Sequence, residues 1–235
     1  MSAPRNQRVF WAGLIATAVL FAAAILTTFF VAPVAAKMGI VQKIFYLHVP
    51  AAITMQVLFV ACGIASIVVL ARGSDKADRF AVACSEVGVV MSLCVLMSGP
   101  LWARKEWGHF WEWEPRLTLT MVLCLLFVAY TALRAYGGLD PLTRKIAAGI
   151  AISGIPAIYL VRVAVEWWRG THPRVVWTGG LQDPGMRLAF GLGIAAFLSL
   201  GSLLVWQRLR LERARADFEA LALDAAARFD LEDDA

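Results

Sequence analysis

Residues 49–71 read VPAAITMQVLFVACGIASIVVLA and contain no charged side chain. As a helix, a stretch of this length crosses the ~30 Å hydrocarbon core of a bilayer. Five further apolar stretches lie at residues 9–31, 80–100, 117–136, 146–165 and 186–206. None shows the period-2 alternation of a membrane barrel. Because backbone groups in hydrocarbon must be hydrogen-bonded internally, we expect an all-α integral membrane protein, a bundle of six transmembrane helices.

Composition supports this fold class. The chain is 60% hydrophobic and 17% charged, whereas soluble domains are nearer half apolar and a quarter charged. We expect one membrane domain over residues 1–206 and a tail over 207–235, which begins basic and ends acidic. Pro50 and Pro100 are placed at the ends of predicted spans, and Pro156 is the one proline expected inside a helix.

The distribution of Lys and Arg predicts the orientation. With six spans, both termini share a side with the connections near residues 72–79 and 137–145, and this side carries the larger share of Lys and Arg. The positive-inside rule then places both termini in the cytoplasm. The other, outer side is also basic, which indicates an anionic ligand there.

The outer connection between the third and fourth predicted helices, residues 101–118, is rich in tryptophan. Four of the nine Trp residues lie between Trp102 and Trp113. An aromatic belt, the alternative interpretation, distributes Trp over the ends of many helices. The concentration in one segment favours a platform on which a flat, apolar ligand stacks, formed by Trp102, Trp107, Gly108, Phe110, Trp111 and Trp113.

All three histidines fall on the predicted outer side. His48 ends the first outer connection, and His172 follows the pair Trp167 and Trp168 in the third. Each alone could be an interfacial polar group that pairs locally. Two neutral imidazoles beside a tryptophan platform instead favour haem, with iron bound by His48 and His172 and the ring stacked on Trp faces. Secondary candidates are His109, Trp167 and Trp168.

Haem also carries two propionates, which need cationic partners. The same outer layer contains the charged residues expected to contact the propionates or a partner protein: Lys43, Arg104, Lys105, Glu114, Arg116, Arg169 and Arg174.

Three segments resemble the cytochrome c maturation protein C family, the haem exporter protein C of a wider tryptophan-rich, haem-handling superfamily. Residues 107–118 resemble the family's signature Trp-Gly-x-x-Trp-x-Trp-Asp-x-Arg-Leu-Thr, except that Glu114 stands where the family has Asp. Residues 46–50 resemble the segment of the first haem-ligating histidine, and residues 155–172 the segment leading to the second. Residues 169–171 are Arg-Gly-Thr rather than the usual Asn-Thr-Leu.

The resemblance implies a haem-binding and haem-delivery protein of cytochrome c maturation in a bacterial inner membrane, surrounded by lipid. It implies that haem b is bound transiently at the periplasmic surface and presented to a periplasmic haem chaperone. Further implied partners are the ATPase and membrane subunits of an ABC-type transporter and a small single-span membrane protein. The chain is then not an enzyme and binds no nucleic acid. It has no G-x-x-x-x-G-K-[ST] motif, so ATP hydrolysis would belong to a partner subunit.

Two other functions are compatible with six helices. An electron-transfer cytochrome b subunit usually holds haem between histidines deep in the membrane, and no predicted span has a histidine at mid-depth. A small-molecule permease needs ionisable groups along its path. Glu86 and Arg162 are the clear candidates, and both are placed near helix ends.

Overall fold

Six long helices make up most of the part of the chain that the structure describes. The computed structural model describes residues 5–36, 38–137, 140–168, 170, 172–173 and 179–233. In these ranges lie α1 (Arg5–Leu26), α2 (Phe45–Arg72), α3 (Asp75–Glu106), α4 (Pro115–Gly137), α5 (Pro141–Trp167) and α6 (Pro184–Asp233). A π-helical turn, η1 (Thr27–Val31), extends α1, and a 3-10 turn, η2 (Ile40–Ile44), precedes α2. All six helical segments are long and apolar enough to cross a membrane, which confirms the predicted fold class.

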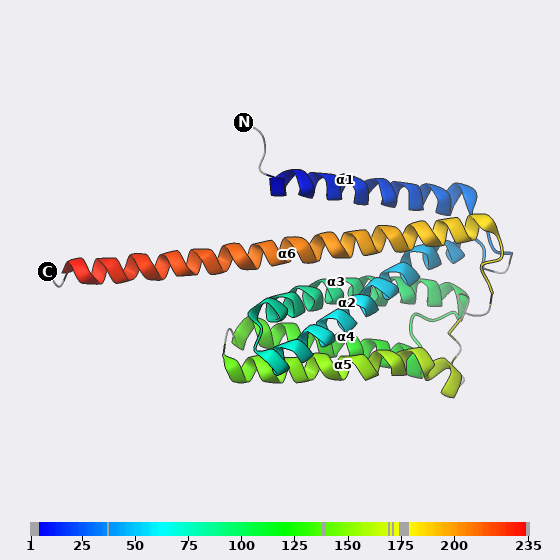
Figure 1. Cartoon of the computed structure of the whole chain (residues 1–235). Coiled ribbons are helices and arrows are strands. Elements are labelled where there is room, and N and C mark those ends of the chain that lie inside the picture. Colours follow the sequence, from blue (N-terminus) through cyan, green and yellow to red (C-terminus); the bar gives the residue numbers. More distant parts are fainter. Residues whose placement is uncertain are drawn as a thin grey trace.

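The helices form two groups. Helices α2 to α5 pack as a bundle, with α2 against both α3 and α5, and α4 against α5. Helix α1 packs mainly against α6, and this pair lies along one side of the bundle (Figure 1). The connections α1–α2, α3–α4 and α5–α6 meet at one end of the molecule, which we call the site end (Figure 1). The α2–α3 and α4–α5 turns lie at the opposite end.

Several helices are longer than the apolar stretches that predict them. Helix α2 already begins at Phe45 and α3 continues to Glu106, so Pro50 and Pro100 lie inside helices rather than at the ends of the helices, where they were expected. Helix α6 runs without a break from Pro184 to Asp233 and so joins the predicted membrane domain to the predicted tail. Hydropathy marks the part of a helix that lies in hydrocarbon, whereas the helix itself can continue through the polar interface.

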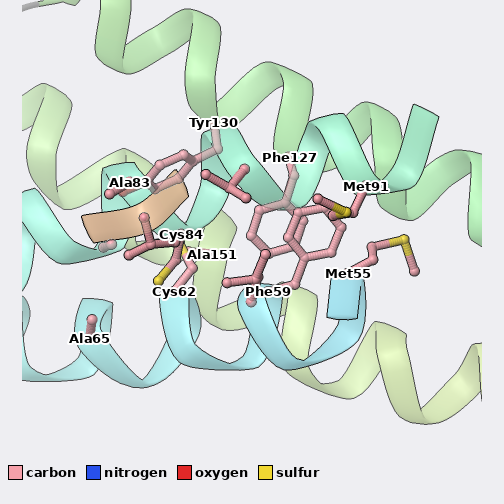
Figure 2. Close-up of a cluster of buried hydrophobic side chains, with 14 of the residues drawn as sticks. Met55, Phe59, Cys62, Ala65, Ala83, Cys84, Met91, Phe127, Tyr130 and Ala151 are labelled. Atoms are coloured by element: carbon pink, nitrogen blue, oxygen red, sulfur yellow. The ribbon is translucent and has the colours of Figure 1, made fainter. Parts of the chain in front are cut away.

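A stacked pair of aromatic rings occupies the middle of the bundle. The rings of Phe59 on α2 and Phe127 on α4 are nearly parallel, with centroids 3.7 Å apart (Figure 2). A Cβ atom at Gly88 would lie 2.5 Å from the Phe59 ring, and one at Gly154 would lie 2.6 Å from the Phe127 ring. Glycine on α3 and on α5 therefore makes room for the pair.

Ion pairs join the helices at the opposite end. Arg134 of α4 donates to Asp78 of α3 at 2.6 Å, and both side chains are nearly buried. Arg144 of α5 lies 2.8 Å from Asp75. Further along α3, Glu86 accepts hydrogen bonds from Arg208 of α6. Buried or partly buried charges are thus paired, as a low-dielectric environment requires.

Substitution of Phe59 tests whether the stacked pair of Phe59 and Phe127 belongs to the packed core. Phe59→Ala should lower the stability of the detergent-solubilised protein by on the order of 3 kcal/mol, because it leaves a cavity beside Phe127 in a bundle held by van der Waals packing. Phe30→Ala is the control, since Phe30 is 82% exposed. Equal thermal unfolding midpoints for the two variants would contradict the assignment of the stack to the core.

Candidate functional site

A cavity of about 370 Å³ lies at the site end between α2, α3, α4 and the connections. This volume is within the range of small-molecule pockets, which are mostly apolar with a few placed polar groups. Among its lining residues, those with aromatic or polar side chains are Gln42, Phe45, His48, Gln56, Trp102, Trp107, Trp111, Arg116, Thr120 and His172. The cavity thus brings together both predicted iron ligands, three predicted platform residues and one predicted cation.

His48 lies in the first turn of α2 and faces α3. Its Nδ1 is 2.9 Å from the hydroxyl oxygen of Ser98. A Cβ atom at the neighbouring Gly99 would lie 3.3 Å from His48 Cε1, so the imidazole packs closely on the α3 backbone. The other predicted iron ligand, His172, is not part of a helix.

His172 lies beyond the end of α5, in the connection to α6, and its side chain is 22% exposed. Its ring centroid is 6.5 Å from that of Trp102. Its Nδ1 is 3.8 Å from Glu114 Oε1, too far for a hydrogen bond. Burial, together with the nearby positive charge of Arg116 and the proximity of His48, lowers the pKa of His172 to about 3. The imidazole is therefore neutral at physiological pH, as a metal ligand must be.

The predicted aromatic platform is divided between the cavity and the surface. Trp102 and Trp107 line the cavity with their rings edge to face, 5.2 Å between centroids. Gly108, at φ 84°, then turns the chain in a backbone conformation that side chains disfavour. Trp111 also lines the cavity, whereas Phe110 and Trp113 point away and are 56% and 73% exposed. Trp102, Trp107 and Trp111 thus face the cavity while Phe110 and Trp113 are exposed, a division that the sequence alone could not give.

The predicted cations also differ in position. Arg116, in the first turn of α4, lines the cavity. The Lys43 ammonium is buried and donates hydrogen bonds to the carbonyls of Ala32 and Pro33. These bonds stabilise the α1–α2 connection. Arg104 and Lys105 are exposed at the end of α3. Arg169 and Arg174 lie outside the described residues.

The remaining candidates surround the cavity without lining it. Glu114 is buried behind His172, and a Cβ atom at Gly170 would lie 3.0 Å from its Oε2. His109 is exposed and pairs with Glu112 at 2.6 Å. Trp167 and Trp168 are exposed at the end of α5.

Sequence reasoning missed several lining residues. Gln56 follows His48 by eight residues and Thr120 follows Arg116 by four, so both lie close to the helix faces of predicted site residues. Extending helical periodicity from those residues could have found them. Nothing in the sequence identifies Ser98, because its contact with His48 depends on how α2 and α3 pack.

The cavity ends at the bundle core. Met55 lines the cavity and also belongs to the core cluster. In the cluster shown in Figure 2, Met91 and the stacked rings of Phe59 and Phe127 lie close to Met55. Among the described residues, packed apolar side chains therefore fill the bundle on the inner side of the cavity.

The fold and the cavity together define a multi-pass helical membrane protein with a ligand pocket at one end. Comparison with known proteins agrees: the family model described as Heme exporter protein C matches residues 3–223. The chain belongs to the Heme exporter protein C family.

Relatives named Heme exporter protein C include proteins of three bacteria. The protein of Escherichia coli K12 is 30% identical over 179 residues, which are 76% of this chain and 73% of that protein. The protein of Paracoccus denitrificans is 30% identical over 83% of this chain and 81% of its own length. That of Rhodobacter capsulatus is 34% identical over 61% of this chain and 60% of its own length.

The lowered pKa of His172 predicts a pH dependence of stability. An unfolded histidine takes up a proton below about pH 6.5, whereas the buried one does so only near pH 3. The unfolded state thus binds more protons in this window, and stability should fall as the pH is lowered from about 6.5. In His172→Asn this part of the fall should disappear, as measured by thermal unfolding in detergent between pH 7.5 and 4.5. The exposed His109→Asn serves as the control, and an unchanged profile in His172→Asn would contradict the burial of His172.

Proposed function

We propose that this chain binds haem in the cavity at the site end and presents it for export in cytochrome c maturation. The observation that carries the proposal is that His48 and His172, from opposite halves of the chain, line one pocket with three tryptophans. Two imidazoles are axial ligands suited to haem iron, and tryptophan faces suit a porphyrin ring. The relatives' printed name, Heme exporter protein C, supports the same cargo.

Each group in the cavity has a distinct role in this proposal. His48 and His172 ligate the iron of haem b, which is bound transiently as cargo. Trp102, Trp107 and Trp111 support the ring. Arg116 is the predicted cation that lines the cavity, and it would hold a propionate by a charge-assisted hydrogen bond.

The exposed candidates suit a protein partner better than the haem. Phe110 and Trp113 present large aromatic surfaces outside the cavity, and the guanidinium carbon of the exposed Arg104 lies 5.6 Å from the centroid of the Phe110 ring. Exposed aromatics grouped on one surface are typical of interaction sites. We propose that they engage the periplasmic haem chaperone, with the site end periplasmic and both termini cytoplasmic in a bacterial inner membrane.

Further partners are proposed on the family resemblance. These are the ATPase and membrane subunits of an ABC-type transporter and a small single-span protein, with ATP hydrolysis carried out by the ATPase rather than by this chain. The cytoplasmic part of α6, over residues 207–233, is then a candidate contact for the ATPase.

The packed core weighs against a permease function for this chain alone. Haem passing between the helices would have to displace Phe59, Phe127 and Met91, which are buried. Glu86, a candidate for a polar path, is instead paired with Arg208. An electron-transfer function is not favoured either, because His48 and His172 lie at helix ends.

The two-histidine assignment is tested by optical absorption of the purified chain after haem addition. The parent should show a Soret band, and His48→Ala and His172→Ala should each weaken or shift it, because each removes an axial ligand. The exposed His109→Ala is the control. A band unchanged in both cavity variants would contradict the ligand assignment, and a parent with no band would contradict haem binding.

The role of Arg116 is tested by haem titration. Arg116→Gln should weaken haem binding about ten-fold, since a charge-assisted hydrogen bond is lost. Arg104→Gln, at an exposed position, should bind as the parent does. Haem dimethyl ester has no propionate charge, so the Arg116→Gln variant and the parent should bind the ester with equal affinity. Equal losses for haem and its ester would refute the propionate contact.

A further inference from the structure

The two imidazoles in the cavity are held in different ways. The His48 ring belongs to helix α2 and contacts α3 through a hydrogen bond and a close backbone approach at Gly99. His172 belongs to a connection, and its Nδ1 has no hydrogen-bond partner among the described residues. The position of the His48 ring is therefore fixed by more contacts than that of the His172 ring.

The hydrogen bonds of Ser98 determine which nitrogen of His48 carries the proton. The Ser98 hydroxyl donates its single proton to the Cys94 carbonyl, at 2.6 Å. It can then only accept from His48, so Nδ1 must be the protonated nitrogen of the neutral ring. The lone pair is left on Nε2, the nitrogen available to a metal.

The α3 backbone restricts the ring further. A Cβ atom at Gly99 would lie 3.3 Å from His48 Cε1, tighter than most van der Waals contacts. The imidazole is therefore packed against α3 at Gly99 and bonded to it at Ser98. A ligand fixed by such outer contacts is pre-oriented, and the hydrogen bond from Nδ1 raises the basicity of Nε2.

We propose that Ser98 is a positioning residue that makes His48 the retained iron ligand, and that His172 is the ligand that leaves when haem is handed over. This inference rests on the proposed haem-binding function. Release needs one weak axial bond, and His172 has the features of that ligand: it lies in a connection, its side chain is partly exposed, and its Nδ1 has no hydrogen-bond partner among the described residues. Retention by His48 keeps the haem oriented until the partner has engaged it.

Haem titration of the purified full-length chain tests the first part. Ser98→Ala should weaken haem binding about ten-fold, the lower range of effects seen when a metal ligand loses its outer partner. Ser98→Thr keeps the hydroxyl and should restore binding. The control is Ser153→Ala on α5, where an exposed hydroxyl makes a similar bond to a carbonyl of its own helix. The haem reduction potential should rise in Ser98→Ala, since a less basic ligand favours ferric iron less.

A double-mutant cycle separates positioning from general stability. The effect of Ser98→Ala should vanish in a His48→Ala background and persist in a His172→Ala background. An equal loss in both backgrounds, or no loss in the single variant, would overturn the role of Ser98. A parent chain that takes up no haem would overturn the proposed function itself, and this inference with it.

Carbon monoxide tests which ligand leaves. In ferrous haem, CO takes one axial position, and we expect it to replace His172. His48 is then opposite the CO, so Ser98→Ala should shift the C–O stretching frequency in the infrared spectrum. No shift, with Ser98→Ala still weakening haem binding, would mean that CO replaces His48 and would overturn the assignment of His48 as the retained ligand.

Discussion

The requirement that a backbone in hydrocarbon satisfies its own hydrogen bonds governs this molecule. It makes the membrane-spanning part helical and confines changes of chain direction to the two ends of the bundle. Irregular backbone, and with it any loop-borne functional group, can then occur only near a membrane surface. The cavity between His48 and His172 lies at such an end, where helix starts, the extended end of α3 and three connections meet.

The two ends of the bundle are stabilised by different means. At the opposite end, short turns and ion pairs such as Asp78 with Arg134 hold α3, α4 and α5 together. At the site end the connections are longer and carry aromatics, and the helices separate enough to leave a cavity. The stacked rings of Phe59 and Phe127 lie between these regions and close the bundle on the inner side. The packed part of the bundle thus supports the end that contains the cavity, as the proposed binding of haem there requires.

The cavity combines groups fixed on helices with groups carried by connections. His48 and Arg116 lie in first turns of helices, so their backbones are fixed by the bundle. His172 and Trp111 lie in connections, whose position depends on contacts with neighbours such as Trp102. For the proposed haem delivery this division is useful, because the groups fixed on helices would define the orientation of the cargo. The exposed Phe110 and Trp113 then lie where a partner would approach.

Much of the fold and of the candidate site could be predicted from the amino-acid sequence. The six apolar stretches predicted six helices, because the thickness of the bilayer translates directly into a number of residues. The tryptophan-rich signature, with His48 and His172, predicted the family and the residues that the cavity later brought together. Local patterns of this kind are visible because each depends on neighbours along the chain.

Other features depend on the tertiary structure. Hydropathy could not show that α3 continues through Pro100 to Glu106, since the polar interface still supports a helix. Nor could it divide the aromatics into Trp102, Trp107 and Trp111 inside the cavity and Phe110 and Trp113 outside. The sequence by itself determined the class of fold, the family and the candidate ligands. Only the packing of α2 on α3 decided that Ser98 contacts His48, because that contact joins residues fifty positions apart whose distance depends on how two helices meet.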